Sequence, residues 1–246
     1  FVDGYLFSLK RWYIKAITPL SGLNSFKLIP KDLLIDSNSS INMVVMNFLS
    51  IDFSTDIGSI FVKAKYKSFS KILQSDKLNN DLLMKQILDF FAENNLNFSD
   101  ISKIFVNQGP GNFSGLRGSL AIVKGISLAK NLNLFGYDSF IWISSKFYKK
   151  KDCIFSLVEF RDRYFLKKFD SELKNLSQVE EVGSNEIAKK IGNNFCAISR
   201  KSMKHFDAKA IKLNNFGIVD LDHNALEFLH LMGLLDKKLI KPLYLG

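Results

Sequence analysis

Three short segments follow residue 45, the first apolar and the other two with alternating hydrophobic and polar residues. These segments are "MNFLSIDFST" (46–55), "IGSIFVKA" (57–64) and "KYKSFSKIL" (65–73), and only short connectors separate them. The first is an apolar run that ends in an acid and hydroxyl residues. Alternation of this kind is typical of β-strands. We therefore expect three consecutive strands at the start of the folded region.

A helical pattern comes next, from about Lys77 to Asn94. Its apolar residues recur at helical spacing, and Met84 and Leu88 widen the face beyond a narrow stripe. The face comprises Leu78, Leu82, Leu83, Ile87, Phe90 and Phe91.

The next segments complete a first α/β half. "ISKIFVNQG" (101–109) predicts a fourth strand, a long helix follows from about Ser114 to Leu132, and "LFGYDS" (134–139) predicts a fifth strand. "FIWISSKFY" (140–148) predicts a short helix. The order β-β-β-α-β-α-β indicates a mixed sheet with helices packed against it.

The second half starts again at Asp152. "CIFSLVEF" (153–160) and "RYFLKKF" (163–169) predict a strand pair that turns at Arg161 and Asp162. Shorter strands and helices near 184–191 and 224–235 follow. Two α/β halves of this kind favour one fold used twice.

The first 45 residues have no sustained period and end in the polar run "DSNSSIN". No methionine precedes Met43, so we expect the native protein to begin at Met43 or Met46. The predicted organisation is a non-family extension (1–45), a first lobe (46–145) and a second, shorter lobe with a C-terminal helix and tail (146–246).

Composition restricts the function classes. The 47% hydrophobic fraction of the 246 residues supplies a core, and no apolar run is long enough for a membrane span. The two cysteines, Cys153 and Cys196, match neither a disulfide framework nor a zinc spacing, which favours a reducing compartment. The net charge of +10 permits RNA contact, but lysines on solvated faces explain it as well.

The run "NQGPGNFSGLRG" (107–118) holds four glycines and a proline directly before a helix. It satisfies neither the P-loop nor the dinucleotide motif, although a helix start attracts anions. Ser114 is not in a G-x-S-x-G nucleophile turn, and all histidines come late in the chain. Besides an anion-binding loop and a nucleophile turn, a third interpretation is structural. The glycines then supply unusual backbone angles, and Asn112 or Ser114 caps the helix.

Arg117 lies in the first turn of this helix, where a cation meets the positive end of the helix dipole. An anion is therefore expected nearby. Asp52 is the candidate internal partner, and a bound phosphate or an acidic residue of another chain is the alternative.

The helix behind the loop carries small residues on one face, which lets another helix approach closely. These residues are Gly118, Ala121, Gly125 and Ala129. Together with Leu83, Ile87 and Phe91 on the preceding helix, they predict an intermolecular helix bundle. Packing inside the same domain is the alternative.

"GPGNFSGLR" (109–117) closely resembles the G-P-G-S-F-T-G-L-R signature of the TsaB family, the non-catalytic subunits of the bacterial machinery for tRNA threonylcarbamoyladenosine (t6A). "MNFLSIDFST", "LFGYDSF", "VEFRDRYF" and "KPLYLG" are similar, in order, to further family segments. The departures are Phe53 in place of a Thr, Leu78 or Asn79 in place of a His, and Gly246 in place of an Arg.

The resemblance implies two RNase H-like lobes of the actin, sugar kinase and Hsp70 superfamily. It implies a cytoplasmic protein without a catalytic site that binds and activates a TsaD-type transferase as a heterodimer, with a TsaE-type ATPase and tRNA as further partners. A homodimer through the first-lobe helices is a further implication. No membrane contact is expected. No metal is expected either, because the paired histidines with which TsaD binds its metal are missing.

The alternative function is an ATP-dependent small-molecule kinase of the same superfold, and a serine glycopeptidase is a third. No cofactor is assigned, and ATP or ADP at the complex interface stays open. The candidates for nucleotide, anion or interface contact are Asp52, Ser54, Thr55, Gly109, Pro110, Gly111, Ser114, Gly115 and Arg117.

Overall fold

The computed structural model describes residues 46–73, 80–202, 213–237 and 240–244. Residues 46–246 cluster as one compact unit, and the fold below is that of this unit. The predicted extension 1–45, and the predictions for Leu78, Asn79 and Gly246, fall outside the described residues.

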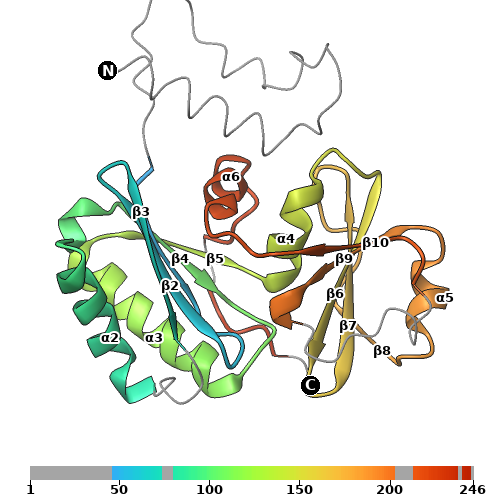
Figure 1. Cartoon of the computed structure of the whole chain (residues 1–246), viewed down its shortest axis with the longest axis horizontal. Coiled ribbons are helices and arrows are strands. Elements are labelled where there is room, and N and C mark those ends of the chain that lie inside the picture. The colour runs from blue at the N-terminus through green and yellow to red at the C-terminus, as the bar shows by residue number, and fades with distance from the viewer. Residues whose placement is uncertain (1–45, 74–79, 203–212, 238–239, 245–246) are drawn as a thin grey trace, which may run out of the picture. The chain divides into compact units, whose positions relative to one another are not determined.

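The first sheet has the strand order β3-β2-β1-β4-β5 (Figure 1). Strands β1, β2 and β3 are antiparallel neighbours, and β4 and β5 run parallel to β1. The strands are β1 (Phe48–Asp52), β2 (Gly58–Ala64), β3 (Lys67–Leu73), β4 (Lys103–Asn107) and β5 (Asn133–Tyr137). All five predicted strands of the first half are thus confirmed.

The second sheet repeats this plan with the order β10-β9-β6-β7-β8. Its first three strands in the chain are again antiparallel neighbours, and its fourth and fifth run parallel to its first. The strands are β6 (Cys153–Phe160), β7 (Arg163–Asp170), β8 (Glu180–Val182), β9 (Phe195–Ser199) and β10 (Phe216–Val219). The mixed α/β fold with two lobes that the resemblance implies is therefore present.

Helices cover the outer face of each sheet, and further helices lie between the two sheets (Figure 1). Between the sheets lies a core to which both contribute, including Phe48, Phe105 and Phe169. The helices are α2 (Asn80–Glu93), α3 (Phe113–Lys130), α4 (Ser139–Ser144), α5 (Ile187–Ile191) and α6 (Ala225–Leu231), with the 3-10 helices η3 (Phe98–Asp100), η4 (Ser145–Phe147) and η5 (Arg200–Ser202). In the described part of the chain, no helix is long and apolar enough to cross a membrane.

The C-terminal segment returns to the first lobe after β10. Leu226 and Leu229 of α6 join the core between the sheets, and Gly136 of β5 pairs with Asp236. The tail then passes the glycine run, because the Leu243 amide donates to the Gln108 carbonyl at 2.7 Å. Residues 241–244 of the tail and the glycine run, which both carried the family resemblance, are thus neighbours.

Candidate functional site

Asp52 ends β1 and points toward the other lobe. Successive strand residues face opposite sides of a sheet: Leu49 and Ile51 pack in the core beneath α2 and α3, whereas Phe48 packs in the core between the sheets. Asp52 shares the parity of Phe48 and Ser50. Its side chain is 1% exposed, so the period of one strand places a carboxylate at the buried junction of the lobes.

Four donors surround this carboxylate. Asp52 Oδ1 accepts from the Ser54 amide at 3.0 Å, the Ser54 hydroxyl at 2.7 Å and Asn107 Nδ2 at 3.0 Å. Asp52 Oδ2 accepts from Lys201 Nζ at 2.5 Å. Burial by itself would raise the pKa of Asp52, but the Lys201 ammonium and the Ser54 hydrogen bonds outweigh it and hold the pKa below its usual value. Asp52 is therefore an ionised carboxylate.

Asn107 connects Asp52 to the glycine run. It is the last residue of β4, and its Nδ2 also lies within hydrogen-bond distance of the hydroxyls of Ser54 (3.2 Å) and Ser139 (3.1 Å). Its Oδ1 accepts from the Gly109 amide at 2.8 Å. Because each of these groups is buried, satisfied hydrogen bonds are needed to keep them there. Asn107 thus fixes the exit of β4 against the exit of β1.

The glycines of the run let its backbone touch the β1 exit. A Cβ atom at Gly111 would lie 2.0 Å from the Ser54 carbonyl oxygen, and one at Gly115 would lie 2.4 Å from the Phe53 carbonyl oxygen. Gly109 has a φ of 111°, in the region that favours glycine, and its peptide bond to Pro110 is cis. Side chains at these positions would separate the helix start from the strand.

Several amides of the run already have internal acceptors. The Asn112 amide donates to the Ser54 carbonyl at 2.7 Å, and the Ser114 amide donates to Asn112 Oδ1 at 3.2 Å, which makes Asn112 the cap of α3. The Gly109 amide is bonded to Asn107, as described above. These contacts agree with the structural interpretation of the run, and Thr55 lies apart in an exposed turn with Ile57.

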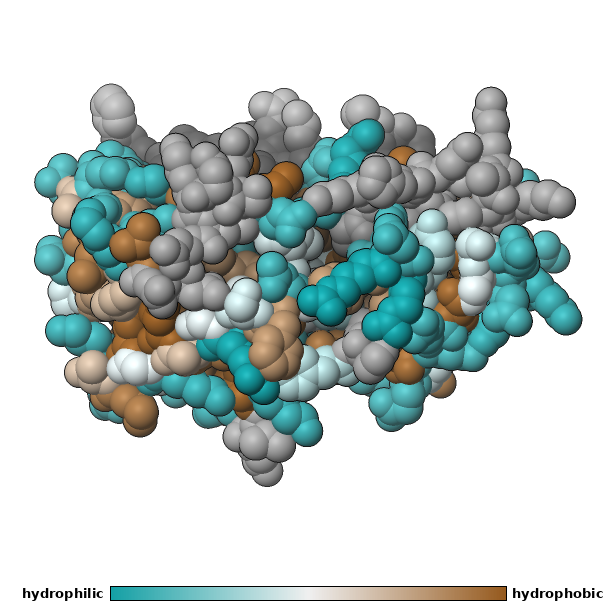
Figure 2. All heavy atoms as spheres, turned by 90° about the horizontal axis from the view of Figure 1, so that it is seen from below, coloured by the Kyte–Doolittle hydropathy of each residue, from teal (hydrophilic) through white to brown (hydrophobic). Residues whose placement is uncertain are grey.

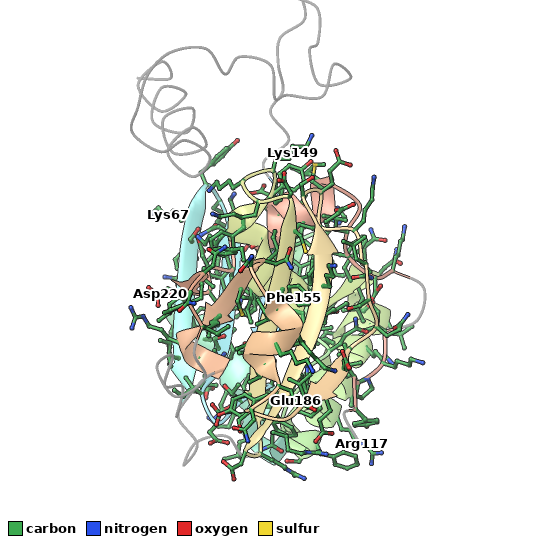
Figure 3. The ribbon with its side chains drawn as sticks, turned by 90° about the vertical axis from the view of Figure 1, so that its right-hand side faces the viewer. Lys67, Arg117, Lys149, Phe155, Glu186 and Asp220 are labelled. Carbon is green, nitrogen blue, oxygen red and sulfur yellow. The ribbon has the colours of Figure 1, made fainter. Side chains whose placement is uncertain are left out.

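Arg117 is not paired with Asp52, so that prediction is wrong. Its Nε donates to the Tyr244 hydroxyl at 2.7 Å, and its guanidinium carbon lies 3.8 Å from the centre of the Phe113 ring. Figure 3 shows Arg117 at the surface of the molecule. Asp52 faces the junction of the lobes, where Lys201 takes the place expected for Arg117. Phe113 and Tyr244 are both about half exposed, so the three side chains form a surface cluster.

The structure gives Ser114 no base. Its hydroxyl donates to Asn112 Oδ1 at 3.1 Å. Of the two histidines in the described ranges, His223 lies between Ser50 and Ser59, and His230 packs on Phe rings of the first sheet. Among the residues that the structure describes, no three His, Cys, Asp or Glu side chains gather into a metal site.

His223 fills the junction between the lobes. Its Nδ1 is 2.8 Å from the Ser50 hydroxyl and its Nε2 is 3.0 Å from the Ser59 hydroxyl. Its ring stacks on Phe61 with 5.2 Å between the ring centres. Burial lowers the pKa of His223 to about 4, so the imidazole is neutral at physiological pH and acts as a packed core residue.

The predicted helix interface divides into an exposed part and a buried part. Ala121, Gly125 and Ala129 of α3 are exposed and Gly118 is half buried, and a Cβ at Gly125 would meet no described residue within 4 Å. Leu83, Ile87 and Phe91 of α2, in contrast, are at most 3% exposed. They pack on the sheet of their own lobe and cannot form a contact surface, so that part of the prediction is corrected.

Other apolar side chains of the two helices do reach the surface. Leu128 of α3 is 84% exposed, and Leu82 and Leu88 of α2 are each 47% exposed. Leu128 lies three residues after Gly125, which places it on the same face of α3. Figure 2 shows more apolar surface on the first-lobe side, at the left of the view, than on the second-lobe side.

Sequence reasoning missed several members of the site. Asn107 could have been found, since it opens the glycine run near the end of a predicted strand. Ser139 is likewise at the end of the predicted fifth strand. Lys201 and His223 have no local signal, because each contacts residues that lie more than a hundred positions away.

Comparisons with known proteins bear on this arrangement. The family model of TsaD, tRNA N6-adenosine threonylcarbamoyltransferase, matches residues 75–156, which include α2 and α3. The tRNA threonylcarbamoyladenosine biosynthesis protein TsaB of Buchnera aphidicola subsp. Baizongia pistaciae is 32% identical over 91 residues. The matched segment is 36% of this chain and 40% of that protein, so the match spans less than half of the curated relative.

Two solved structures from Pseudomonas aeruginosa share the fold. One is YeaZ, with 16% identity and a TM-score of 0.61, and the other is an uncharacterised protein with similarity to the peptidase YeaZ, with 15% identity and a TM-score of 0.62. Each comparison covers 82% of this chain and 100% of the other chain. The two structures show a shared fold, and the curated TsaB relative and the TsaD family model show that this chain resembles the TsaB family over part of its length.

Proposed function

We propose that this chain is a non-catalytic subunit of the t6A machinery, which binds and activates a TsaD-type threonylcarbamoyltransferase in the cytoplasm. The resemblance to TsaB supports the pathway. The observation that carries the subunit role is the exposed stripe on α3, formed by Ala121, Gly125 and Leu128. A TsaE-type ATPase and tRNA would join through the complex, and the cofactor stays open.

The α3 stripe has the features of a helix-packing surface. Small residues let two helix axes come close, and an apolar residue beside them is buried when they do. Glycine inside a helix costs about 1 kcal/mol relative to alanine, yet none of the residues that the structure describes lies close enough to the Cβ position of Gly125 to require a glycine there. A partner helix at this face would account for both the glycine and the exposed Leu128.

The match to the TsaD family supports a contact between equivalent helix pairs of this chain and of the transferase. Residues 75–156 of this chain resemble a segment of the transferase family itself, and that segment contains α2 and α3. A transferase with an equivalent helix pair could pack it against this one about a pseudo-two-fold axis. A homodimer would use the same face, so the two assemblies would compete for it.

The contacts of Asp52 and Ser114 support the proposal of a subunit without a catalytic site. The Asp52 carboxylate is enclosed by four donors, and the Ser114 hydroxyl is bonded to its own cap residue. The kinase alternative would require an accessible carboxylate in the cleft, and Asp52 is 1% exposed. No contact in the described residues favours the kinase or the glycopeptidase over the subunit.

Reconstitution of tRNA modification tests the proposal. The transferase and the ATPase from the same source are combined with tRNA and threonylcarbamoyl-adenylate, and t6A is measured by mass spectrometry of the digested tRNA. We expect t6A to form only when this chain is added. Equal t6A formation without the chain would refute the proposal, and ATP turnover by the chain alone that Asp52→Asn abolishes would support the kinase.

A further inference from the structure

Lys201 reaches Asp52 from the other lobe. Asp52 ends the first strand of the first sheet, and Lys201 lies in η5, directly after the fourth strand of the second sheet. Their side chains are 1% and 18% exposed, and the Nζ–Oδ2 distance is 2.5 Å. The pair therefore joins residues that are 149 positions apart across the junction of the lobes.

The repeat of the fold explains why these two segments meet. In each sheet the fourth strand pairs in parallel with the first, so the loop after the fourth strand begins beside the end of the first. Gly109 is the second residue after β4, and Lys201 is the second residue after β9. Asn107, at the end of β4, and Lys201, shortly after β9, both donate to the Asp52 carboxylate. The fourth strands of the two sheets therefore each lead to one donor for the same carboxylate.

The geometry leaves no room for a metal–nucleotide at this carboxylate. A carboxylate accepts through two oxygens, with about two lone pairs on each. Asp52 Oδ1 already has three donors within 3.0 Å. The Lys201 ammonium covers Oδ2, and a divalent cation there would be repelled by it at short range. The nucleotide chemistry of the wider superfamily therefore does not fit the residues of this chain at Asp52.

A second ion pair crosses the same junction. Lys167 Nζ of β7 lies 2.6 Å from Asp138 Oδ2 in front of α4, and their side chains are 12% and 18% exposed. Asp138 Oδ1 also accepts from the Ile141 amide at 2.7 Å and caps α4. Lys201 is thus part of a set of contacts that hold the lobes in one arrangement.

We infer that Lys201 is a built-in counter-cation, which replaces a metal–nucleotide at Asp52 and latches the two lobes together. A side chain of the protein itself then holds the two lobes together, and no bound ligand is required for that contact. The inference goes beyond the proposed subunit role and does not rest on it.

A double-mutant cycle tests the latch. The free energy of unfolding is measured in urea for the wild type, Asp52→Asn, Lys201→Met and the double variant. Removing one partner leaves the other buried charge unpaired, so Lys201→Met should lower the folding equilibrium constant by about a hundredfold or more. The double variant, which has neither charge, should be at least about tenfold more stable than Lys201→Met.

Coupled and additive effects in the double-mutant cycle have opposite meanings for the latch. Single effects that simply add in the double variant would overturn the latch. If Lys201→Met does not fold, a folded double variant still supports the inference, and an unfolded one contradicts it.

Ligand binding gives an independent test that does not involve the transferase. The wild type and Asp52→Asn are titrated with MgADP in a calorimeter, and their affinities are compared. We expect no difference, because Lys201 already occupies Asp52. A wild-type affinity that Asp52→Asn lowers tenfold would show that the nucleotide displaces Lys201, and would overturn the inference.

Discussion

One substitution made at two glycines of α3 tests the account of the glycine run. Gly115 and Gly125 are in the same helix, but only Gly115 lies against the β1 exit. A methyl group at Gly125 would meet nothing within 4 Å in the described part of the chain, whereas one at Gly115 would lie 2.4 Å from the Phe53 carbonyl oxygen. Gly125→Ala is therefore a matched control for Gly115→Ala.

The magnitudes follow from these two environments. Alanine stabilises a helix interior by about 1 kcal/mol relative to glycine, so Gly125→Ala should raise the free energy of unfolding by about 0.5–1 kcal/mol. At Gly115 the same gain is opposed by overpacking, which costs about 1–3 kcal/mol. Backbone rather than a flexible side chain is in contact, so we expect a net loss of about 1–2 kcal/mol. The two variants should differ by about 1.5–3 kcal/mol.

Urea unfolding followed by circular dichroism measures this difference. The same slope with denaturant in all three proteins would show that the variants unfold from comparable native states. Stabilisation of Gly115→Ala by as much as Gly125→Ala would show that the helix start does not press on the strand, and would refute the packing account of the run.

Three further predictions address pH and the surface. The pKa of His223 is about 4 when folded and about 6.5 when unfolded; the unfolded state thus binds more protons between these values, and stability should fall by about 3 kcal/mol as the pH drops from 6.5 to below 4. His223→Phe should reduce this slope in unfolding curves recorded across that range, and an unchanged slope would assign it to other groups. Leu128→Lys should weaken transferase binding at least tenfold in a pull-down titration, while Leu231→Lys on α6, the control at a residue that is 60% exposed, should not; equal effects would remove α3 from the interface. Arg117→Ala should cost less than about 1 kcal/mol in urea unfolding, since it removes only an exposed contact with Tyr244 and an aromatic ring, and a larger loss would make Arg117 a core support.

The sequence predicted the helices and strands better than it predicted the contacts between residues far apart in the chain. A short apolar run identified β1, which is buried on both faces because its residues face one of two cores, and the helical period identified α3. The end of α6 was placed too late: the helix stops at Leu231, and Gly233 with a φ of 70° takes the left-handed conformation that commonly ends helices.

Contacts between distant segments explain what could not be predicted. The apolar period of α2 showed which side of the helix is hydrophobic, but not that its own sheet covers Leu83 and Ile87. Arg117 has its partner in Tyr244, 127 positions later, and Asp52 has its partner in the other lobe. Only the folded arrangement brings these residues together, so the pairing of Arg117 with Asp52 was a reasonable local inference with the wrong result.

Direct measurement of the complex tests the central claim. The chain is mixed with the TsaD-type transferase from the same source, and the molar mass of the eluted species is determined by light scattering after size exclusion. The account predicts a stable one-to-one complex for the wild type, and separate proteins for Leu128→Lys under the same conditions. Separate elution of the wild-type chain and the transferase at micromolar concentrations would contradict the claim that this chain is the transferase's binding subunit.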